Sequence, residues 1–447
     1  MKILCYVAPW CVEQYSTIAR FIDKESDVVL MSQFSEIDET KMSEKYYDNL
    51  NSKDARADDI NPDDFIKRCR LLRHMKRNDA LLHLFSMKSA VSNALDLETP
   101  TIVISEVVDQ YIIDLLRFEC QQRGVLFFGL VTSFVNGYFR ITSRGEPWQS
   151  RDVGDVEVER QIQEIKKINY TPNFTPQNNG KVVTCIAIFK KVVLNWARIP
   201  YFFLKRFVYP GQRYNYHYYA SYISALNNFQ IFPRCWLGDR SWREKSRDKG
   251  KLVIFHPLQM YPEATIEYWC TSLTSIEYEK KLVEIVRSMD KFAHFLIKEH
   301  PNVIGVRNPR LYKTLSRMDN VTFVPTSVKS NLVLDVSDSV LVWTGSVGFE
   351  AALRGKPVLT VCNPYYTQGS KFKQIDAHTT DKEIIDFIEN NSDSLTRADE
   401  WRLMSNLLGM LRPGHYINDS SWSRLNPEHI KQAKQIGDQI RRELINI

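Results

Sequence analysis

The sequence of 447 residues contains no run of about 18 uninterrupted apolar residues, the length that a membrane-spanning helix needs. It has only 17 glycines and 18 prolines, which excludes a fibrous or low-complexity chain. The formal net charge of +6 is mild for this length, so no nucleic-acid partner is expected. At roughly 100–200 residues per domain, the length favours two domains.

Cysteine motifs are also missing, because the eight cysteines are dispersed and none belongs to a C-x-x-C pair. We therefore expect reduced, mostly buried thiols, and neither a zinc ribbon nor a disulfide framework. The cysteines are Cys5, Cys11, Cys69, Cys120, Cys185, Cys235, Cys270 and Cys362.

The first apolar run, residues 3–8, breaks at Pro9 and is followed by Glu13, which favours a first strand over a signal peptide. A soluble cytoplasmic protein is expected.

Several well-known catalytic motifs are absent. There is no G-x-G-x-x-G after a strand, no Walker A motif, no H-E-x-x-H and no G-x-S-x-G. No Asp-x-Asp pair follows a predicted strand, since Asp335 and Asp338 have a different spacing. The sequence therefore predicts no metal site.

Strand-like and helix-like segments alternate in both halves of the chain. This pattern predicts βαβ units and parallel sheets, and so an α/β fold. We expect two Rossmann-like domains facing a central cleft, at residues 1–238 and 250–390, followed by C-terminal helices at 391–447. The charged segment 239–250 is predicted to be a linker, residues 36–62 a surface loop or mobile flap, and residues 357–362 the last strand.

One segment, residues 188–219, interleaves basic and aromatic side chains. Its basic residues are Lys190, Lys191, Arg198, Lys205, Arg206 and Arg213, and its aromatic residues include Trp196, Tyr201, Phe202, Phe203, Phe207 and Tyr209. A helix of this composition can lie on an anionic membrane surface. The alternative is a connector whose aromatic rings are buried against the two domains.

A strand–turn–helix pattern spans residues 343–357. Gly345 allows a tight turn, Ser346 can cap a short helix, and Gly355 with Pro357 can end it. The helix N-terminus suits a phosphate, with added hydrogen bonds from Thr344 and Ser346, and Glu350 can receive a ribose. The alternative is a well-capped structural helix that binds no ligand.

A second pattern is Lys298-Glu-His-Pro301 at the end of a predicted strand, followed by Arg307, Arg310 and Lys313. His300 can donate to a phosphate oxygen, while Lys298 and Arg307 supply charge for a departing phosphate. A second His-Pro pair occurs at residues 256–257, and either histidine can instead be purely structural.

Three carboxylates also follow predicted strands: Glu106 and Asp109 in the first half and Glu263 in the second. If the two sheets oppose each other, one acid from each side can deprotonate an acceptor hydroxyl and stabilise or attack an anomeric carbon. The alternative for Glu106 is a cap on the following helix.

Taken in order, these motifs resemble the capsule polysaccharide synthesis family of bacterial glycosyltransferases. The resemblance covers residues 257–366 and rests on Pro257-Leu-Gln259 with Pro262-Glu263, Lys298-Glu-His-Pro301, Ser330, Thr344-Gly345-Ser346 with Gly348-Phe-Glu-Ala351, Gly355-Lys-Pro-Val358 and Tyr365-Tyr366. The first half matches loosely, through residues 104–106 and the helix and strand after them.

The resemblance implies a GT-B fold whose second domain holds the nucleotide-sugar and whose final helices cross back to the first, acceptor-side domain. Several relatives transfer Kdo from CMP-Kdo with retention, which needs a nucleophilic carboxylate or a front-face route. Carried over, the donor-binding residues are Gln259, Lys298, His300, Pro301, Arg307, Ser330, Thr344, Gly345, Ser346 and Glu350. Glu106, Asp109 and Glu263 would be catalytic.

The expected function is a metal-independent glycosyltransferase of capsule or lipopolysaccharide biosynthesis that uses no cofactor beyond its nucleotide-sugar donor, CMP-Kdo as first choice. Its expected partners are a glycan or lipid-linked glycan acceptor, the inner face of the cytoplasmic membrane and other polysaccharide-assembly enzymes. Kdo-transferring relatives commonly carry an Asp shortly after the Gln of this loop, whereas the nearest acid here is Glu263 behind Pro262, so a UDP- or GDP-sugar donor is an alternative. A non-catalytic GT-B scaffold and a sugar-nucleotide epimerase are the others.

Overall fold

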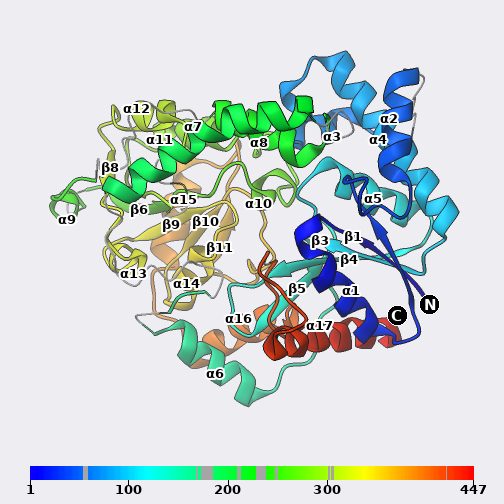
Figure 1. Cartoon of the computed structure of the whole chain (residues 1–447). Helices are drawn as coiled ribbons and strands as arrows, with labels where there is room; N and C mark the ends of the chain where they lie inside the picture. Colours follow the sequence, from blue (N-terminus) through cyan, green and yellow to red (C-terminus); the bar gives the residue numbers. More distant parts are fainter. Residues whose placement is uncertain are drawn as a thin grey trace.

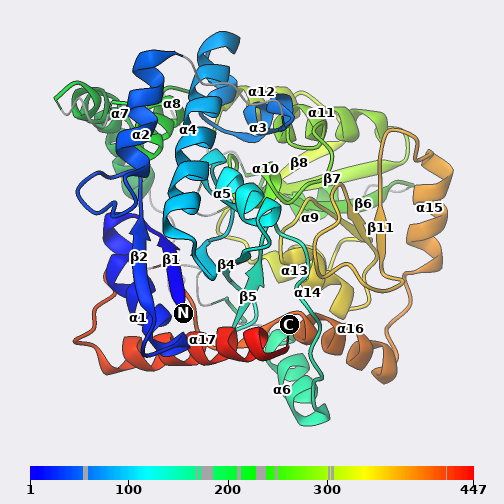
Figure 2. The same cartoon turned by 90° about the vertical axis from the view of Figure 1, so that its right-hand side faces the viewer.

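The two halves of the chain each build one six-stranded sheet, and Figures 1 and 2 show these sheets in two separate lobes. The structure is a computed structural model, which describes residues 1–53, 59–167, 170–172, 185–208, 213–227, 238–246, 250–300, 303, 307–418 and 420–446. The predicted α/β class with two Rossmann-like domains is thus confirmed.

The first sheet has the order β12-β5-β4-β3-β1-β2. Strands β1 to β4 pair in parallel, whereas β5 and β12 are antiparallel to their neighbours. Apolar residues fill both faces of β1 and β3, as expected for strands covered by helices on both sides. The strands are β1 (Lys2–Tyr6), β2 (Asp27–Met31), β3 (Ile102–Glu106), β4 (Leu126–Thr132), β5 (Tyr138–Thr142) and β12 (Arg412–Pro413).

The second sheet has the order β11-β10-β9-β6-β7-β8, and all its neighbouring strands are parallel. Its chain runs from β6 to β8 on one side and then from β9 to β11 on the other, which is the doubly wound arrangement of a nucleotide-binding fold. The strands are β6 (Leu252–Pro257), β7 (Ala293–Lys298), β8 (Val321–Val324), β9 (Ser339–Val342), β10 (Val358–Thr360) and β11 (Phe372–Gln374).

Helices cover both faces of each sheet. Those before the second sheet are α1 (Val12–Ile22), α2 (Met42–Ser52), α3 (Pro62–Arg68), α4 (Arg77–Glu98), α5 (Tyr111–Gln122), α6 (Asp155–Ile165), α7 (Cys185–Val208), α8 (Tyr216–Asn227) and α9 (Trp242–Lys245). Those that follow are α10 (Ala264–Glu267), α11 (Tyr278–Ser288), α12 (Pro309–Leu315), α13 (Ser330–Leu334), α14 (Val347–Leu353), α15 (Asp381–Asn390), α16 (Arg397–Gly409) and α17 (Pro427–Asn446). Short 3-10 turns occupy Pro9–Cys11 and Leu72–His74. No helix in the described ranges combines the length and apolarity needed to cross a bilayer.

The C-terminal tail returns to the first domain. Strand β12 pairs with β5, and α17 lies along α1 at the bottom of Figure 1. Arg441 of α17 donates to the carbonyl of Ile22 at 2.7 Å, and a buried ion pair joins Arg412 to Glu443 at 2.6 Å. The tail therefore contributes both a helix and an edge strand to the first domain.

Three sequence predictions differ from the structure. Within the segment predicted as a loop or flap, Met42–Ser52 forms helix α2, because Met42, Tyr46 and Leu50 recur at helical spacing and are buried. Residues 357–362 do not hold the last strand, since β11 and β12 follow.

The third difference concerns the cysteines. Cys270 and Cys362 form a disulfide with a Cα–Cα distance of 5.2 Å, although all the cysteines were expected to be reduced. Their 92-residue separation and unlike neighbours leave no spacing motif, and only the fold brings them together. Cys5, Cys11, Cys69 and Cys120 are free and buried, as predicted.

Candidate functional site

Two loops meet at the centre of the second sheet, where β6 lies beside β9 and the strand order reverses. The loop after β6 carries Gln259, and the turn after β9 carries Thr344 and Gly345. A Cβ built on Gly345 would lie 2.5 Å from Nε2 of Gln259, so only glycine permits this contact. In doubly wound sheets, ligands bind at the carboxyl ends of the strands at this point.

The Thr344 side chain is the best evidence of a ligand at this turn. Its hydroxyl is buried and has no hydrogen-bond partner in the described chain. A buried hydroxyl without a partner costs free energy, so such a group calls for a ligand or water. The carbonyl of Gly345 accepts a 2.6 Å hydrogen bond from Tyr366, which leaves the Thr344 hydroxyl as the open polar group.

Gly348 permits the approach of Tyr366, since a Cβ there would lie 2.9 Å from its Oη. Ser346 immediately precedes α14 but makes no capping hydrogen bond with the helix backbone, contrary to the expected cap. Burial raises the pKa of Glu350 to about 7, although Arg354 and a hydrogen bond from Ser346 act to lower it. The four predicted residues of this turn and helix thus lie together: Thr344, Gly345, Ser346 and Glu350. The Ser346 hydroxyl donates a hydrogen bond to the Glu350 carboxylate.

Arg307 has a different place from the one expected. Its side chain is only 1% exposed, and its guanidinium donates to both oxygens of Glu299 at 2.7 and 2.9 Å. A further hydrogen bond of 2.6 Å reaches the backbone carbonyl of Gln259. Tyr312 donates to the same Glu299 carboxylate. This buried pair holds the Gln259 loop in position, and Arg307 does not reach the cleft as a phosphate ligand.

The remaining donor-site residues lie on neighbouring strand ends. Lys298 ends β7, and burial lowers its pKa, which the charge of Glu299 partly offsets. His300 is partly exposed two residues further on, and its backbone N–H donates to Glu299. Ser330 begins α13, the helix that precedes β9. The prediction for Pro301 falls outside the described residues.

The second His-Pro pair is structural. His256 is completely buried, with its ring nitrogens 2.8 Å from the carbonyl of Leu341 and 3.0 Å from the hydroxyl of Tyr278. Burial lowers the pKa of His256 to about 4, so the ring is neutral. It orders the strand end from which the Gln259 loop departs.

In the first domain, Glu106 and Asp109 lie where β3 meets β1, the corresponding reversal of strand order in that sheet. Glu106 is not a helix cap, because α5 begins after Gln110. Burial and mutual repulsion raise the pKa of Glu106, while burial is the main cause that raises that of Asp109. The C-terminal tail supplies Asn418, which hydrogen-bonds Glu106.

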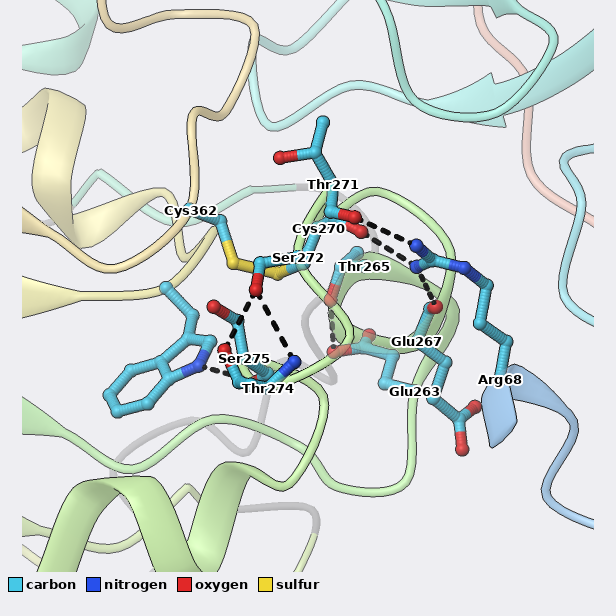
Figure 3. The surroundings of a disulfide bond; sticks show 11 residues. Arg68, Glu263, Thr265, Glu267, Cys270, Thr271, Ser272, Thr274, Ser275 and Cys362 are labelled. Carbon is cyan, nitrogen blue, oxygen red and sulfur yellow. Dashed lines mark hydrogen bonds between the residues drawn. A yellow bond between two sulfur atoms is a disulfide. The ribbon is translucent and has the colours of Figure 1, made fainter. Parts of the chain in front are cut away.

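The third predicted acid, Glu263, lies on the other side of the cleft, in the segment that Figure 3 shows leading into α10. Thr265 donates to its carboxylate at 3.0 Å. Burial raises the pKa of Glu263 to about 7, against this hydrogen bond and the positive charge of Arg70. A carboxyl group with this pKa exists in both protonation states near neutral pH.

Arg70 connects the acids of the two domains. It forms a 2.8 Å ion pair with Glu267, and it donates to the backbone carbonyl of Asp109 at 3.3 Å. Arg73 pairs with the other oxygen of Glu267, also at 2.8 Å. Arg68 donates to the carbonyls of Glu267, Cys270 and Thr271 (Figure 3). First-domain arginines thus fix the Glu263 segment opposite Asp109.

A cavity of about 520 Å³ lies beside this junction. Its polar lining includes Arg70, Arg73 and Arg310, and its apolar lining comes from α8 through Ala220, Ile223 and Leu226. The cavity therefore combines positive charge with an apolar wall. No group of three or more histidine, cysteine, aspartate or glutamate side chains in the described residues has the arrangement of a metal site.

Sequence reasoning missed Arg70, Arg73, Glu267 and Asn418. None lies in a motif, and their partners are far away in the chain. The local signal is the four-residue spacing of Glu263 and Glu267, which would bring two carboxylates to one face if both lay in a helix, but Glu263 is the extended residue just before α10.

A family model described as "Capsule polysaccharide biosynthesis protein" matches residues 205–384. Searching curated protein sequences finds no significant match.

Among solved structures, KpsC from Thermosulfurimonas dismutans, a beta Kdo 2,7 transferase, is 12% identical over 98% of this chain and 100% of that chain, with a TM-score of 0.39. A beta Kdo 2,4 transferase of KpsC from the same organism is 11% identical over 69% of this chain and 79% of that chain, with a TM-score of 0.32. UDP-GlcNAc 2-epimerase from Neisseria meningitidis is 13% identical over the whole of both chains, with a TM-score of 0.28. At TM-scores below 0.5, none of the three similarities carries an argument about fold, activity or substrate.

The two sheets and their facing strand ends define a GT-B-like fold. Over residues 205–384, the chain is similar to the family described as "Capsule polysaccharide biosynthesis protein", in the region whose motif order resembles that family.

Proposed function

We propose that the protein is a metal-independent glycosyltransferase that extends a bacterial surface polysaccharide, in the capsule or lipopolysaccharide, at the inner face of the cytoplasmic membrane. Its donor is a nucleotide-sugar, with CMP-Kdo as our first choice. This choice rests on the motifs Lys298-Glu-His-Pro301 and Thr344-Gly345-Ser346, which resemble the His-Pro and hydroxyl-bearing motifs of CMP-sugar transferases.

The observation that carries the proposal is the buried Thr344 hydroxyl, which has no hydrogen-bond partner in the described chain and lies beside Gly345 and Gln259. In the proposed complex, the Thr344 hydroxyl donates to the donor phosphate, and the Ser346 hydroxyl turns from Glu350 to the same phosphate when the ribose takes its place on Glu350. Lys298 and His300 add charge and a hydrogen bond, since strand β7 ends beside β6. Glu350 receives the ribose.

The proposed transfer breaks the bond between the anomeric carbon and the phosphate oxygen, and the electron pair leaves with the nucleotide. The acceptor oxygen forms the new bond, and its proton passes to Glu106 or Asp109. Burial raises the pKa of both carboxyls, so each carboxylate, once ionised, is a stronger base than an ordinary one. Glu263, in its ionised form, stabilises the anomeric carbon, or attacks it to form a glycosyl–enzyme bond that the acceptor oxygen then breaks, returning the electron pair to the Glu263 carboxylate.

Arg307 has a positioning role in this proposal. It holds the Gln259 carbonyl at 2.6 Å while Glu299 neutralises its charge. The departing phosphate is then stabilised by Lys298, His300 and the two hydroxyls, and Arg307 acts on it only through the loop.

Nucleotide-dependent thermal stability tests the proposal. The intact protein is melted with CMP, UDP, GDP and their activated sugars, beside variants His300→Ala and His378→Ala. His378 is an exposed histidine of the same domain and serves as the matched control. A ligand at 100 times its Kd adds about 2.7 kcal/mol of stability, which such a measurement detects readily.

We expect CMP to stabilise the wild type and the His378→Ala variant, and His300→Ala to lose the effect. Selective stabilisation by UDP or GDP would keep the glycosyltransferase and replace the donor. No response to any nucleotide would favour a non-catalytic scaffold, and conversion of a nucleotide-sugar without an acceptor would favour an epimerase. Transfer that stops on addition of EDTA and resumes with Mg²⁺ would contradict metal independence.

A further inference from the structure

Helix α7 exposes an extended apolar face. Eighteen large apolar side chains are exposed in the described part of the chain, and eight of them belong to this one helix. Leu204, Phe207 and Val208 are 57%, 55% and 63% exposed. The others are Phe189, Val193, Leu194, Tyr201 and Phe203. Exposed apolar residues are ordinary when scattered, but a concentration of them marks an interaction surface.

The opposite side of α7 anchors the helix to the protein. Val192 and Asn195 are buried, and the Asn195 amide is 3.4 Å from the carbonyl of Ala225 in α8. Arg206 lies 3.5 Å from the ring centre of Tyr219 in α8. Figure 1 shows α7 and α8 along the upper side of the molecule. The helix is therefore held from one side, with its apolar face toward solvent.

The charge of this region has one sign. Residues 165–238 contain ten lysines and arginines and no aspartate or glutamate, although the whole chain has a net charge of only +6. The rest of the chain is therefore slightly acidic. On α7 itself, Lys190 and Arg198 are exposed beside the apolar side chains. An apolar face accompanied only by basic groups complements a surface that combines an apolar interior with anionic headgroups.

We propose that the exposed face of α7 docks on the surface of an anionic lipid bilayer. The helix lies in the plane of the interface, with Phe189, Leu204 and Phe207 in the acyl boundary and Lys190 and Arg198 among the phosphates. It does not span the bilayer, because its basic residues interrupt the apolar sequence. Docking of this kind weakens as salt rises, because it depends in part on charge.

The placement of α8 links this surface to the cleft. Its residues Ala220, Ile223 and Leu226 form one wall of the cavity that contains Arg70 and Arg73. A docked α7 would hold this cavity close to the lipid headgroups. This orientation deepens the proposed function and rests on it, since it suits an acceptor that is carried on a lipid.

Vesicle co-sedimentation tests the docking without requiring activity. The full chain is mixed with vesicles of phosphatidylcholine alone or with 30% (about one lipid in three) phosphatidylglycerol, a fraction that gives a negative surface potential. The two test variants are Leu204→Glu with Phe207→Glu, and Lys190→Glu with Arg198→Glu. The control, Val156→Glu with Leu425→Glu, changes two exposed apolar residues outside α7.

We expect the wild type and the control to pellet with anionic vesicles at least tenfold more strongly than with neutral ones. Both α7 variants should lose at least tenfold of that binding while keeping the wild-type melting temperature. Equal pelleting of the wild type and the α7 variants would overturn the proposal. Equal pelleting of the wild type with neutral and with anionic vesicles would overturn it as well. A wild-type dimer that becomes monomeric in Leu204→Glu with Phe207→Glu would overturn it in favour of a second copy.

The same samples separate the two proposals. Their response to nucleotides is measured by melting, with no lipid present. Vesicle binding without any nucleotide response would leave the docking in place and refute the proposed transferase. A nucleotide response without vesicle binding would support the proposed transferase and refute the docking of α7.

Discussion

Arg70 of the first domain and Glu267 of the second form a 2.8 Å ion pair in which the Glu267 side chain is completely buried. Arg73 pairs with the other oxygen of the same carboxylate. Although burial by itself would lower it, the charge of Glu267 raises the pKa of both arginines. One carboxylate thus pairs with two cations at the junction of the two domains, four residues after Glu263.

Replacing that acid should destabilise the junction strongly. In Glu267→Gln, two partly buried guanidinium groups lose their counter-charge, and breaking such a pair costs about 3–5 kcal/mol. Urea unfolding measures the loss. The matched control is Glu277→Gln, whose partner Lys280 is exposed, and it should unfold like the wild type. Equal midpoints for the two variants would contradict this interpretation of the junction.

The raised pKa of Glu263 predicts opposite effects on activity and stability. Since its pKa rises from an ordinary 4.5 to about 7, folding favours the protonated form. That contribution is fully present below about pH 4.5 and is lost as the pH rises through 7, a difference of at most about 3 kcal/mol. Transfer by the ionised carboxylate should instead increase as the pH rises through 7.

The variant Glu263→Gln removes the titration and keeps the shape. It should therefore abolish transfer, and its stability relative to the wild type should increase between pH 5 and pH 8. Urea unfolding at the two pH values checks this expectation. Glu284→Gln, a substitution at an exposed acid of α11, should show no such trend. A constant difference between Glu263→Gln and the wild type would show that Glu263 does not titrate in this range.

Local sequence patterns were sufficient to predict the central strands of the second domain and the loops that meet at its site. Strands β6, β7 and β9 are short apolar runs followed by glycine, proline or polar residues, and their order along the chain determines which loops meet. For this reason the contact of Gln259 with Gly345 could be anticipated as a site, even though the distance could not. Helix α2 was missed because its polar composition hides three buried apolar residues at helical spacing.

Contacts between distant segments could not be predicted. Glu299 follows Lys298 directly, yet nothing in the sequence shows that Glu299 forms a buried ion pair with Arg307 and so keeps the Arg307 side chain out of the cleft. Arg70 and Glu267 are separated by 197 residues, and Cys270 and Cys362 by 92. Such partners are selected by domain packing, and a single sequence contains no signal for that packing.

Gly345→Ala should impair the donor site with little change in stability. The added Cβ would lie 2.5 Å from the Gln259 amide, which is the flexible end of a side chain and can move aside. We expect the nucleotide Kd to rise at least tenfold, and the free energy of unfolding to change by less than about 1 kcal/mol. Ligand-induced melting shifts and urea unfolding measure the two effects.

Two other glycines provide the comparison. At Gly154 an added Cβ has no neighbour within 4 Å, so Gly154→Ala should change neither quantity. At Gly348 the Cβ would lie 2.9 Å from Val342 in the core as well as from Tyr366, so Gly348→Ala should cost about 1–3 kcal/mol. Unaltered nucleotide binding in Gly345→Ala would place the donor elsewhere.

The disulfide should stabilise the second domain under oxidising conditions. Cys270 follows α10 and Cys362 follows β10, so the bond ties the Glu263 segment to the sheet (Figure 3). Cross-linking residues 92 apart restricts the unfolded chain by about 4.6 kcal/mol in the chain-entropy account. Cys270→Ser with Cys362→Ser should therefore lower the urea midpoint, and a reductant should do the same to the wild type.

The double variant is its own control, because a reductant has no bond to break there and should leave its midpoint unchanged. Peptide mapping without reduction should recover the Cys270 and Cys362 peptides as one linked species. Suppose that peptide mapping shows the disulfide before reduction and that the reductant leaves the urea midpoint of the wild type unchanged. Packing around α10 alone would then order the Glu263 segment. The two arms thus separate the covalent contribution from that of Arg68, whose three hydrogen bonds to backbone carbonyls hold the same segment.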